Sequence, residues 1–142
     1  MKAADKFTHI DNEEDQIYLR TKAFPVNIRL FNTNPEYHQL IQACCAMVKR
    51  AALYDYEDYK KPHGMSGANL AIPFNIIGLV FNRGTKDQYC KVYINPKIVR
   101  KSNETYESKS NCGSIRLDKP IKVLRHEWVE VEYYDEMGAH RI

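Results

Sequence analysis

One stretch of the sequence, Pro35–Tyr54, has the residue spacing of a long helix and most constrains the fold. Asn34 is a good N-cap residue, and Pro35 stands at the first helical position, where its missing N–H is no loss. Apolar residues recur three and four positions apart, so we expect one buried stripe along the helix. The expected stripe is Tyr37, Leu40, Cys44, Met47 and Ala51. With a single clear helix, most of the remaining core must come from strands.

After Gly64 the residue patterns are typical of strands rather than of helices. Gln88–Asn95 alternates apolar and polar residues, which is typical of a half-buried strand, and Asn95-Pro96 is expected to end it. Val129–Tyr133 alternates more strongly, with Val129, Val131 and Tyr133 on one face and glutamates on the other. These patterns predict an α+β domain with mainly antiparallel sheets around one long helix. Shorter strands are expected at Thr105–Ser108, Ser114–Leu117 and Ile121–Leu124.

The 142 residues are enough for one domain. Residues 1–16 are polar and acidic, so we expect an N-terminal arm there and a single domain over residues 17–142. The segment after the helix is polar and rich in tyrosine, and its acidic residues would repel phosphate. It is therefore expected to be a loop that contacts another protein through Tyr54, Tyr56 and Tyr59.

Charge and hydropathy exclude several classes of function. Lys and Arg number 21 against 18 Asp and Glu, a net charge of +3 with no basic stripe, so we expect no specific nucleic-acid partner. The most apolar stretch, Ile76–Phe81, is far too short to span a membrane. The N-terminus lacks the apolar core of a signal peptide, so a cytoplasmic protein is expected. Its cysteines are then reduced thiols, at Cys44, Cys45, Cys90 and Cys112.

A metal-binding motif is suggested and then excluded near the C-terminus. His126-Glu127-Trp128-Val129-Glu130 resembles the beginning of the zinc-helix pattern H-E-x-x-H, with glutamate at the place of the second histidine. The residues that follow alternate with period two, so the segment is predicted to be a strand. On a strand, positions i and i+4 lie about 13 Å apart, too far to share one ion.

Several segments, in this order, resemble the peptide deformylases from about Leu19 to Gly138. Gly67-Ala68-Asn69-Leu70-Ala71-Ile72-Pro73 is similar to the first family motif, a glycine followed by Leu-Ala-Ala-Pro-Gln. Ile94-Asn95-Pro96-Lys97-Ile98 is similar to the stretch before the second motif. Ser110-Asn111-Cys112-Gly113-Ser114 occupies the place of that motif, Glu-Gly-Cys-Leu-Ser. The segment from Arg125 to Gly138 resembles the strand and turn that precede the family's catalytic helix.

The resemblance implies an activity that these residues do not complete. The family removes the N-formyl group from nascent polypeptides with an iron or zinc ion held by the motif-two cysteine and the two histidines of H-E-x-x-H. Cys112 is the only matching ligand position, and Phe74 or Ile72 stands where the family has its oxyanion-binding glutamine. We therefore expect no catalytic residue, no metal and no cofactor. What remains is a remnant groove formed by Gly67, Leu70, Ile72, Asn111, Cys112 and Gly113.

Three functions follow as expectations. The first is a non-catalytic, deformylase-like structural or assembly subunit, as in a phage virion or tail, located in the virion or the host cytoplasm. The second is a deformylase whose H-E-x-x-H helix, with iron or zinc, is supplied by another chain. The third is a module that binds formyl-peptides or peptide termini. The catalytic H-E-x-x-H helix, which should follow Gly138, is expected to be absent from this deformylase-like fold. The apolar surface left by it should be covered by other subunits or by self-association, and its expected lining is Leu70, Ile72, Ile94 and Val131.

Overall fold

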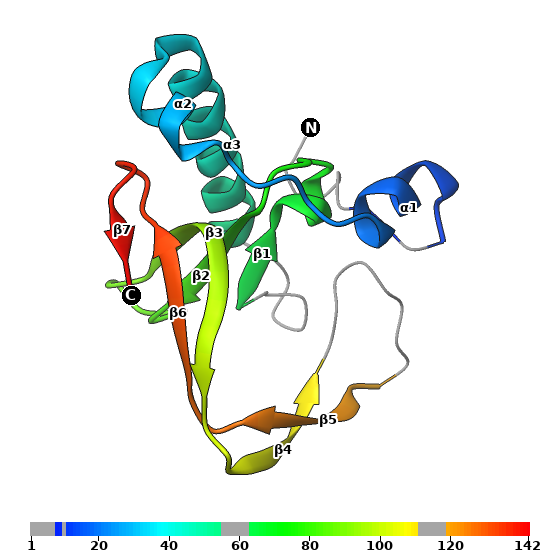
Figure 1. Ribbon diagram of the computed structural model, residues 1–142. Coiled ribbons are helices and arrows are strands. Elements are labelled where there is room, and N and C mark those ends of the chain that lie inside the picture. Colours follow the sequence, from blue (N-terminus) through cyan, green and yellow to red (C-terminus); the bar gives the residue numbers. More distant parts are fainter. Residues whose placement is uncertain (1–7, 10, 55–62, 111–118) are drawn as a thin grey trace.

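The computed structural model describes residues 8–9, 11–54, 63–110 and 119–142 (Figure 1). The expected α+β class is confirmed: helices lie against one antiparallel five-stranded sheet in the order β1-β2-β3-β6-β7, and β4 and β5 pair as a separate two-stranded sheet. The helices are α1 (Glu13–Arg20), α2 (Ile28–Thr33), α3 (Pro35–Leu53) and the 3-10 helix η3 (Gly67–Leu70). The strands are β1 (Gly64–Ser66), β2 (Ile76–Phe81), β3 (Tyr89–Lys101), β4 (Thr105–Ser110), β5 (Ile121–His126), β6 (Val129–Tyr134) and β7 (His140–Arg141).

The long helix α3 is where the sequence predicts it, but the face that it buries is rotated about the helix axis from the expected stripe. Its N-cap is confirmed, because the Asn34 side chain accepts a hydrogen bond from the Tyr37 amide at 3.0 Å. Leu40 and Met47 of the expected stripe are about half exposed, so that part of the prediction is wrong. Apolar residues occupy most of the helix circumference, and only packing against the sheet selects the buried ones. These are Ile41, Cys44, Cys45, Val48, Ala51 and Ala52.

Two short helices that the sequence pattern does not indicate precede α3, and the first of them, α1, begins in the segment where an arm was expected. The helix α1 begins after Asn12, whose side chain accepts from the Glu14 amide, and three acidic residues occupy its first turn. The expected boundary between residues 16 and 17 falls inside this helix. The helix α2 is capped in the same way by Asn27. Helices of eight and six residues are too short to produce a clear periodic signal.

Strand β3 does not end at Asn95-Pro96 as expected, but continues to Lys101. The pairing of β3 with β6 shifts register between Ile94 and Lys97, so a bulge accommodates the proline that cannot donate to the ladder. At this bulge Asn95 adopts a left-handed backbone, with φ 52°. Its side chain accepts from the Val26 amide and donates to the Val26 carbonyl, both at 2.8 Å. The bulge therefore ties the N-terminal segment to the centre of the sheet.

The sequence predicts that the segment His126–Glu130 is not helical, and the structure confirms this. It forms the corner between β5 and β6, and the His126 imidazole lies 2.8 Å from the Ser102 carbonyl oxygen, through Nδ1. Glutamates 130 and 132 lie on the face of β6 opposite to Val129, Val131 and Tyr133, as expected, and Glu130 pairs with Arg100. The expected strand Ser114–Leu117 lies outside the described residues.

The hydrophobic core lies between α3 and one face of the five-stranded sheet. Gly78 allows the close approach of the two layers: a Cβ there would lie 2.8 Å from Cys90 Sγ and 2.9 Å from a Val48 methyl. No helix among the described segments is both long and apolar enough to cross a membrane.

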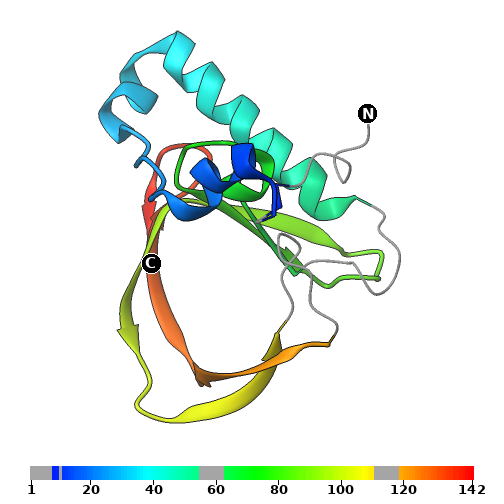
Figure 2. The same cartoon turned by 90° about the vertical axis from the view of Figure 1, so that its right-hand side faces the viewer.

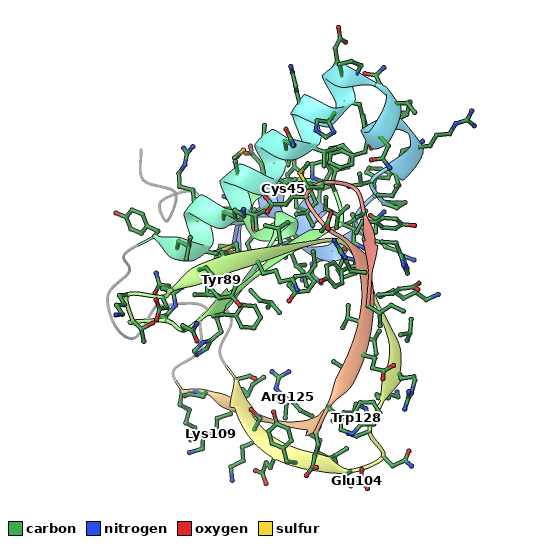
Figure 3. All side chains as sticks on the ribbon, turned by 90° about the vertical axis from the view of Figure 1, so that its left-hand side faces the viewer. Cys45, Tyr89, Glu104, Lys109, Arg125 and Trp128 are labelled. Atoms are coloured by element: carbon green, nitrogen blue, oxygen red, sulfur yellow. The ribbon has the colours of Figure 1, made fainter. Side chains whose placement is uncertain are left out.

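Three cysteines belong to this core as free thiols, Cys44, Cys45 and Cys90, and Cys45 lies on the side of α3 that faces the sheet (Figure 3). Burial raises the pKa of the Cys45 thiol from 9.0 to about 12. The thiolate fraction at pH 8 is then about a thousandfold smaller than in the unfolded chain. We expect Cys45 to resist iodoacetamide at pH 8 in the native protein and to be alkylated readily in urea, as measured by peptide mass spectrometry. Equal rates in the two states would contradict this burial.

Candidate functional site

The candidate site is the face of the sheet that α3 does not cover, here called the inner face. It lines a hollow of about 280 Å³. Figure 2 shows β3 and β6 bending away from α3 towards β4 and β5. Because side chains alternate along strands, each strand that packs against α3 also presents a second set of residues to the other side. The inner face is formed by Ile77, Leu79, Lys91, Tyr93, Val129, Val131, Tyr133 and Ile142.

The inner face is mostly apolar and open. Leu79, in the middle of β2, is 38% exposed, and Val129, at the beginning of β6, is 44% exposed, although both are aliphatic residues of the sheet. The expected lining is confirmed at Val131 but wrong at Ile94 and Ile72, which are 0% and 6% exposed in the core. Leu70 also packs against the core. An exposed apolar surface of this kind is typical of interaction sites and ligand-binding grooves.

A cation lies among the aromatic rings of the inner face. Lys91 Nζ is 5.3 Å from the centre of the Tyr93 ring and 5.1 Å from that of Tyr133. The two rings meet edge to face, with their centres 4.5 Å apart. A hydrogen bond with the Tyr133 side chain raises the pKa of Lys91, so the amine is charged at neutral pH. The alternation of Gln88–Asn95 places Lys91 and Tyr93 on one face, but this signal does not show which face remains open.

The first-motif segment is held rigidly by its backbone. A Cβ at Gly67 would lie 2.8 Å from the Phe74 carbonyl oxygen and 3.0 Å from that of Ile72, so the close approach requires glycine. The Asn69 side chain accepts from the Ser66 amide at 2.9 Å. Ala71 has a left-handed backbone, with φ 57°.

Neither candidate for the family's glutamine position supplies a hydrogen-bond donor. Ile72 is buried, and the Phe74 ring packs edge-on against Tyr37 at 6.3 Å. Gly67, Leu70 and Ile72 therefore form a structural support rather than part of the inner face. The other members of the expected remnant groove, Asn111, Cys112 and Gly113, lie outside the described residues.

The first residue of the second-motif segment, Ser110, is also the last residue of β4. Ser110, which stands where the family motif has glutamate, accepts a hydrogen bond from the Arg125 guanidinium. A neutral hydroxyl thus stands at the position of the motif's glutamate, and it brings no negative charge to this guanidinium.

The described residues do not fit a catalytic metal by themselves. Among them, no group of three or more His, Cys, Asp or Glu side chains is arranged to hold an ion. His126 contacts a backbone carbonyl, and His140 lies 3.5 Å from Glu132 on the edge of the sheet. The iron or zinc that the family normally uses would need ligands in addition to these groups.

Two other features lie away from the inner face. Tyr54 caps the C-terminal end of α3, whereas Tyr56 and Tyr59 lie outside the described residues, so the expected contact loop stays a prediction.

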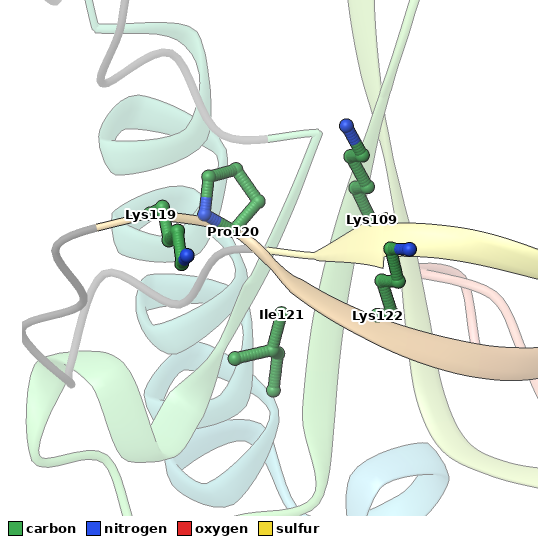
Figure 4. Close-up of a pocket in the computed structure, with 5 residues that line it drawn as sticks. All are labelled: Lys109, Lys119, Pro120, Ile121 and Lys122. Atoms are coloured by element: carbon green, nitrogen blue, oxygen red, sulfur yellow. The ribbon is translucent and has the colours of Figure 1, made fainter.

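A hollow of about 500 Å³ next to β4 and β5 is lined by Lys109, Lys119, Pro120, Ile121 and Lys122 (Figure 4). Its lysines are solvated, and none of its lining residues is buried, so it has no fixed polar group to orient a ligand.

Comparison with known proteins gives consistent results. The family model described as polypeptide deformylase matches residues 7–142. A peptide deformylase of Karelsulcia muelleri is 32% identical over 85 residues, which are 59% of this chain and 44% of that protein. The match therefore spans less than half of that curated relative.

Solved structures have the same fold. A probable peptide deformylase from Synechococcus phage S-SSM7 superposes with a TM-score of 0.67 at 20% identity, covering 96% of this chain and 80% of the other. A class I type b peptide deformylase from Acinetobacter baumannii gives 0.67 at 23% identity, covering 96% and 79%.

Proposed function

Because the chain belongs to the polypeptide deformylase family, we propose that it forms the sheet scaffold of an enzyme that removes the N-formyl group from polypeptides. In this proposal, a metal-binding helix from outside residues 1–142 docks on the inner face and completes the active site. This develops the second of the three functions expected from the sequence. The iron or zinc of the family would be the metal.

The observation that carries the proposal is the open inner face. Fully burying an aliphatic side chain such as Leu79, Val129 or Val131 stabilises a protein by about 1.5–3 kcal/mol. These residues, together with Ile77, form one surface across β2 and β6, and of these strands β2 packs its other side against α3. An amphipathic helix is one of the elements that can bury a sheet face of this kind, and it is the element that carries the H-E-x-x-H motif of the family.

The chain's own part in the chemistry would be binding and positioning. Cys112 is the residue of this sequence that matches a family metal ligand, and a catalytic zinc takes three protein ligands and a water. The 142 residues contain no H-E-x-x-H, so the other ligands and the general base must come with the helix. Since Ile72 and Phe74 cannot donate a hydrogen bond, backbone amides alone would stabilise the developing oxyanion. Losing one such donor typically costs 10²–10³ in rate, so we expect a slow enzyme.

A reconstitution tests this proposal. The chain would be mixed with a synthetic amphipathic peptide that carries H-E-x-x-H, in the presence of zinc. We expect one metal ion per complex and hydrolysis of a formyl-methionyl peptide, because the helix adds the two histidines and the base. The Cys112→Ala variant should bind the same peptide, but hold less than a tenth of the metal and show no hydrolysis.

The controls separate the three functions. Peptide binding by both variants, with no metal and no hydrolysis in either, would overturn the enzymatic proposal and favour an assembly subunit. Binding of the formyl-methionyl peptide to the chain without the helix, and no hydrolysis with it, would favour a peptide-binding module. No other observation favours an assembly subunit, and the relative from a phage is itself described as a probable peptide deformylase.

A further inference from the structure

The inner face has one feature that an apolar docking surface does not need, the ammonium group of Lys91. Its neighbours across the sheet are apolar or aromatic: Leu79 is its partner on β2, and the rings of Tyr93 and Tyr133 flank it. An ammonium group has three N–H donors. The Tyr133 side chain accounts for one hydrogen bond, so at least two donors point to solvent while the face is open.

No acidic side chain of the described inner face balances this charge, since the side chains that line the hollow are apolar or aromatic apart from Lys91 itself. The acidic residues of the adjacent strand β6 lie on its opposite face, where Glu130 pairs with Arg100 at 3.2 Å and Glu132 lies 3.5 Å from His140. Asp135 follows β6 and is already bound to Arg141 at 3.1 Å. The counter-charge of Lys91 is therefore not supplied by an acidic side chain of the described part of the chain.

Covering the inner face with a purely apolar helix would remove water from Lys91. An unpaired charge that is buried in this way weakens binding far more than its contacts with the two tyrosine rings strengthen it. A carboxylate from the covering element would restore the lost hydrogen bonds and add a charge-assisted contact.

We propose that the helix that docks on the inner face carries an aspartate or glutamate, outside any H-E-x-x-H residues, that pairs with Lys91. This inference rests on the proposed function, because it specifies the partner of the same surface. The partner is then an amphipathic helix with an apolar stripe interrupted by one carboxylate, and Lys91 is its specificity residue.

A binding selection tests the pairing. The probe is a display library of amphipathic helical peptides with a fixed apolar stripe, in which one inward position at a time is randomised. It is selected against the wild-type chain and against Lys91→Met and Lys91→Glu. We expect Asp and Glu to be enriched at one inward position on the wild type, apolar residues on Lys91→Met, and Lys or Arg on Lys91→Glu. A recovered glutamate peptide should bind the wild type about tenfold more tightly than its glutamine twin, and the two should bind Lys91→Met equally.

The matched control is Lys97→Met, which removes the same charge from the same strand. Lys97 is the cross-strand neighbour of Glu132, on the side of the sheet opposite to the inner face, so this variant should select the same peptides as the wild type. Thermal unfolding by circular dichroism would check that all variants fold. Identical selections by the wild type and Lys91→Met would overturn the pairing but leave helix docking intact. A wild-type chain that enriches no helix would overturn both.

Discussion

Replacing Phe31 with alanine is expected to lower the free energy of unfolding by about 3–5 kcal/mol, the largest loss that we predict for a single side chain. Phe31 is 1% exposed and is the largest of the fully buried side chains. It stacks on His38 with ring centres 4.4 Å apart, and its ring also lies against Gly138. Truncation would leave a cavity between α2, α3 and the turn after β6, where rigid elements cannot close in.

Urea denaturation followed by circular dichroism would measure this loss. Phe24→Ala is the matched control, because Phe24 is 65% exposed and the same truncation removes little buried surface. We expect the control to change stability by less than about 1 kcal/mol. Similar losses in the two variants would show that Phe31 is not packed as described. Small proteins are stable by only about 5–15 kcal/mol, so this loss would remove between about a fifth and all of the free energy of unfolding.

Replacing Asn95 with alanine is expected to cost about 2–4 kcal/mol, although Asn95 is a polar residue. Its side chain satisfies both the N–H and the C=O of Val26, which is 2% exposed, so the substitution would leave a buried donor and a buried acceptor without partners. Alanine is also disfavoured in the left-handed conformation that Asn95 adopts.

A second left-handed asparagine separates these two causes. Asn82 has φ 56°, but it lies in the exposed turn between β2 and β3, where its side chain makes one long contact with the Asp87 carbonyl oxygen at 3.4 Å. Asn82→Ala should therefore cost only the backbone preference, about 1 kcal/mol. Chemical denaturation of the two variants would measure the difference. Equal losses would mean that the hydrogen bonds to Val26 contribute nothing.

Much of the fold could be predicted because it follows from local interactions. The Asn34 cap and Pro35 define the beginning of α3 within one turn of backbone. The alternation in Val129–Tyr133 separates the two faces of β6 correctly, because side-chain direction along a strand is a local property. The rotation of α3 and the continuation of β3 through Pro96 could not be predicted, since both depend on residues far away in the sequence.

The candidate site was only partly predictable for the same reason. The sequence motifs indicate the family, and they identify Cys112 and the residues near Gly67. The pairing of Lys91 with Tyr133 joins residues 42 positions apart, and no local pattern connects them. Likewise, Leu70, Ile72 and Ile94 read as surface candidates in the motifs, whereas the packed structure places them in or against the core.

The amino-acid sequence by itself determined the α+β class, the long helix with its cap, and the two faces of each alternating strand, because caps and periodicity act over a few residues. Only the tertiary structure decided which sheet face is covered. Strand β2 is apolar on both sides, with Ile76 and Val80 on one and Ile77 and Leu79 on the other. Alternation along the strand creates two such faces, but it does not show which of them is buried. Packing of α3 buries the face with Ile76 and Val80. The face with Ile77 and Leu79, on the same side of the sheet as Lys91, stays exposed to solvent.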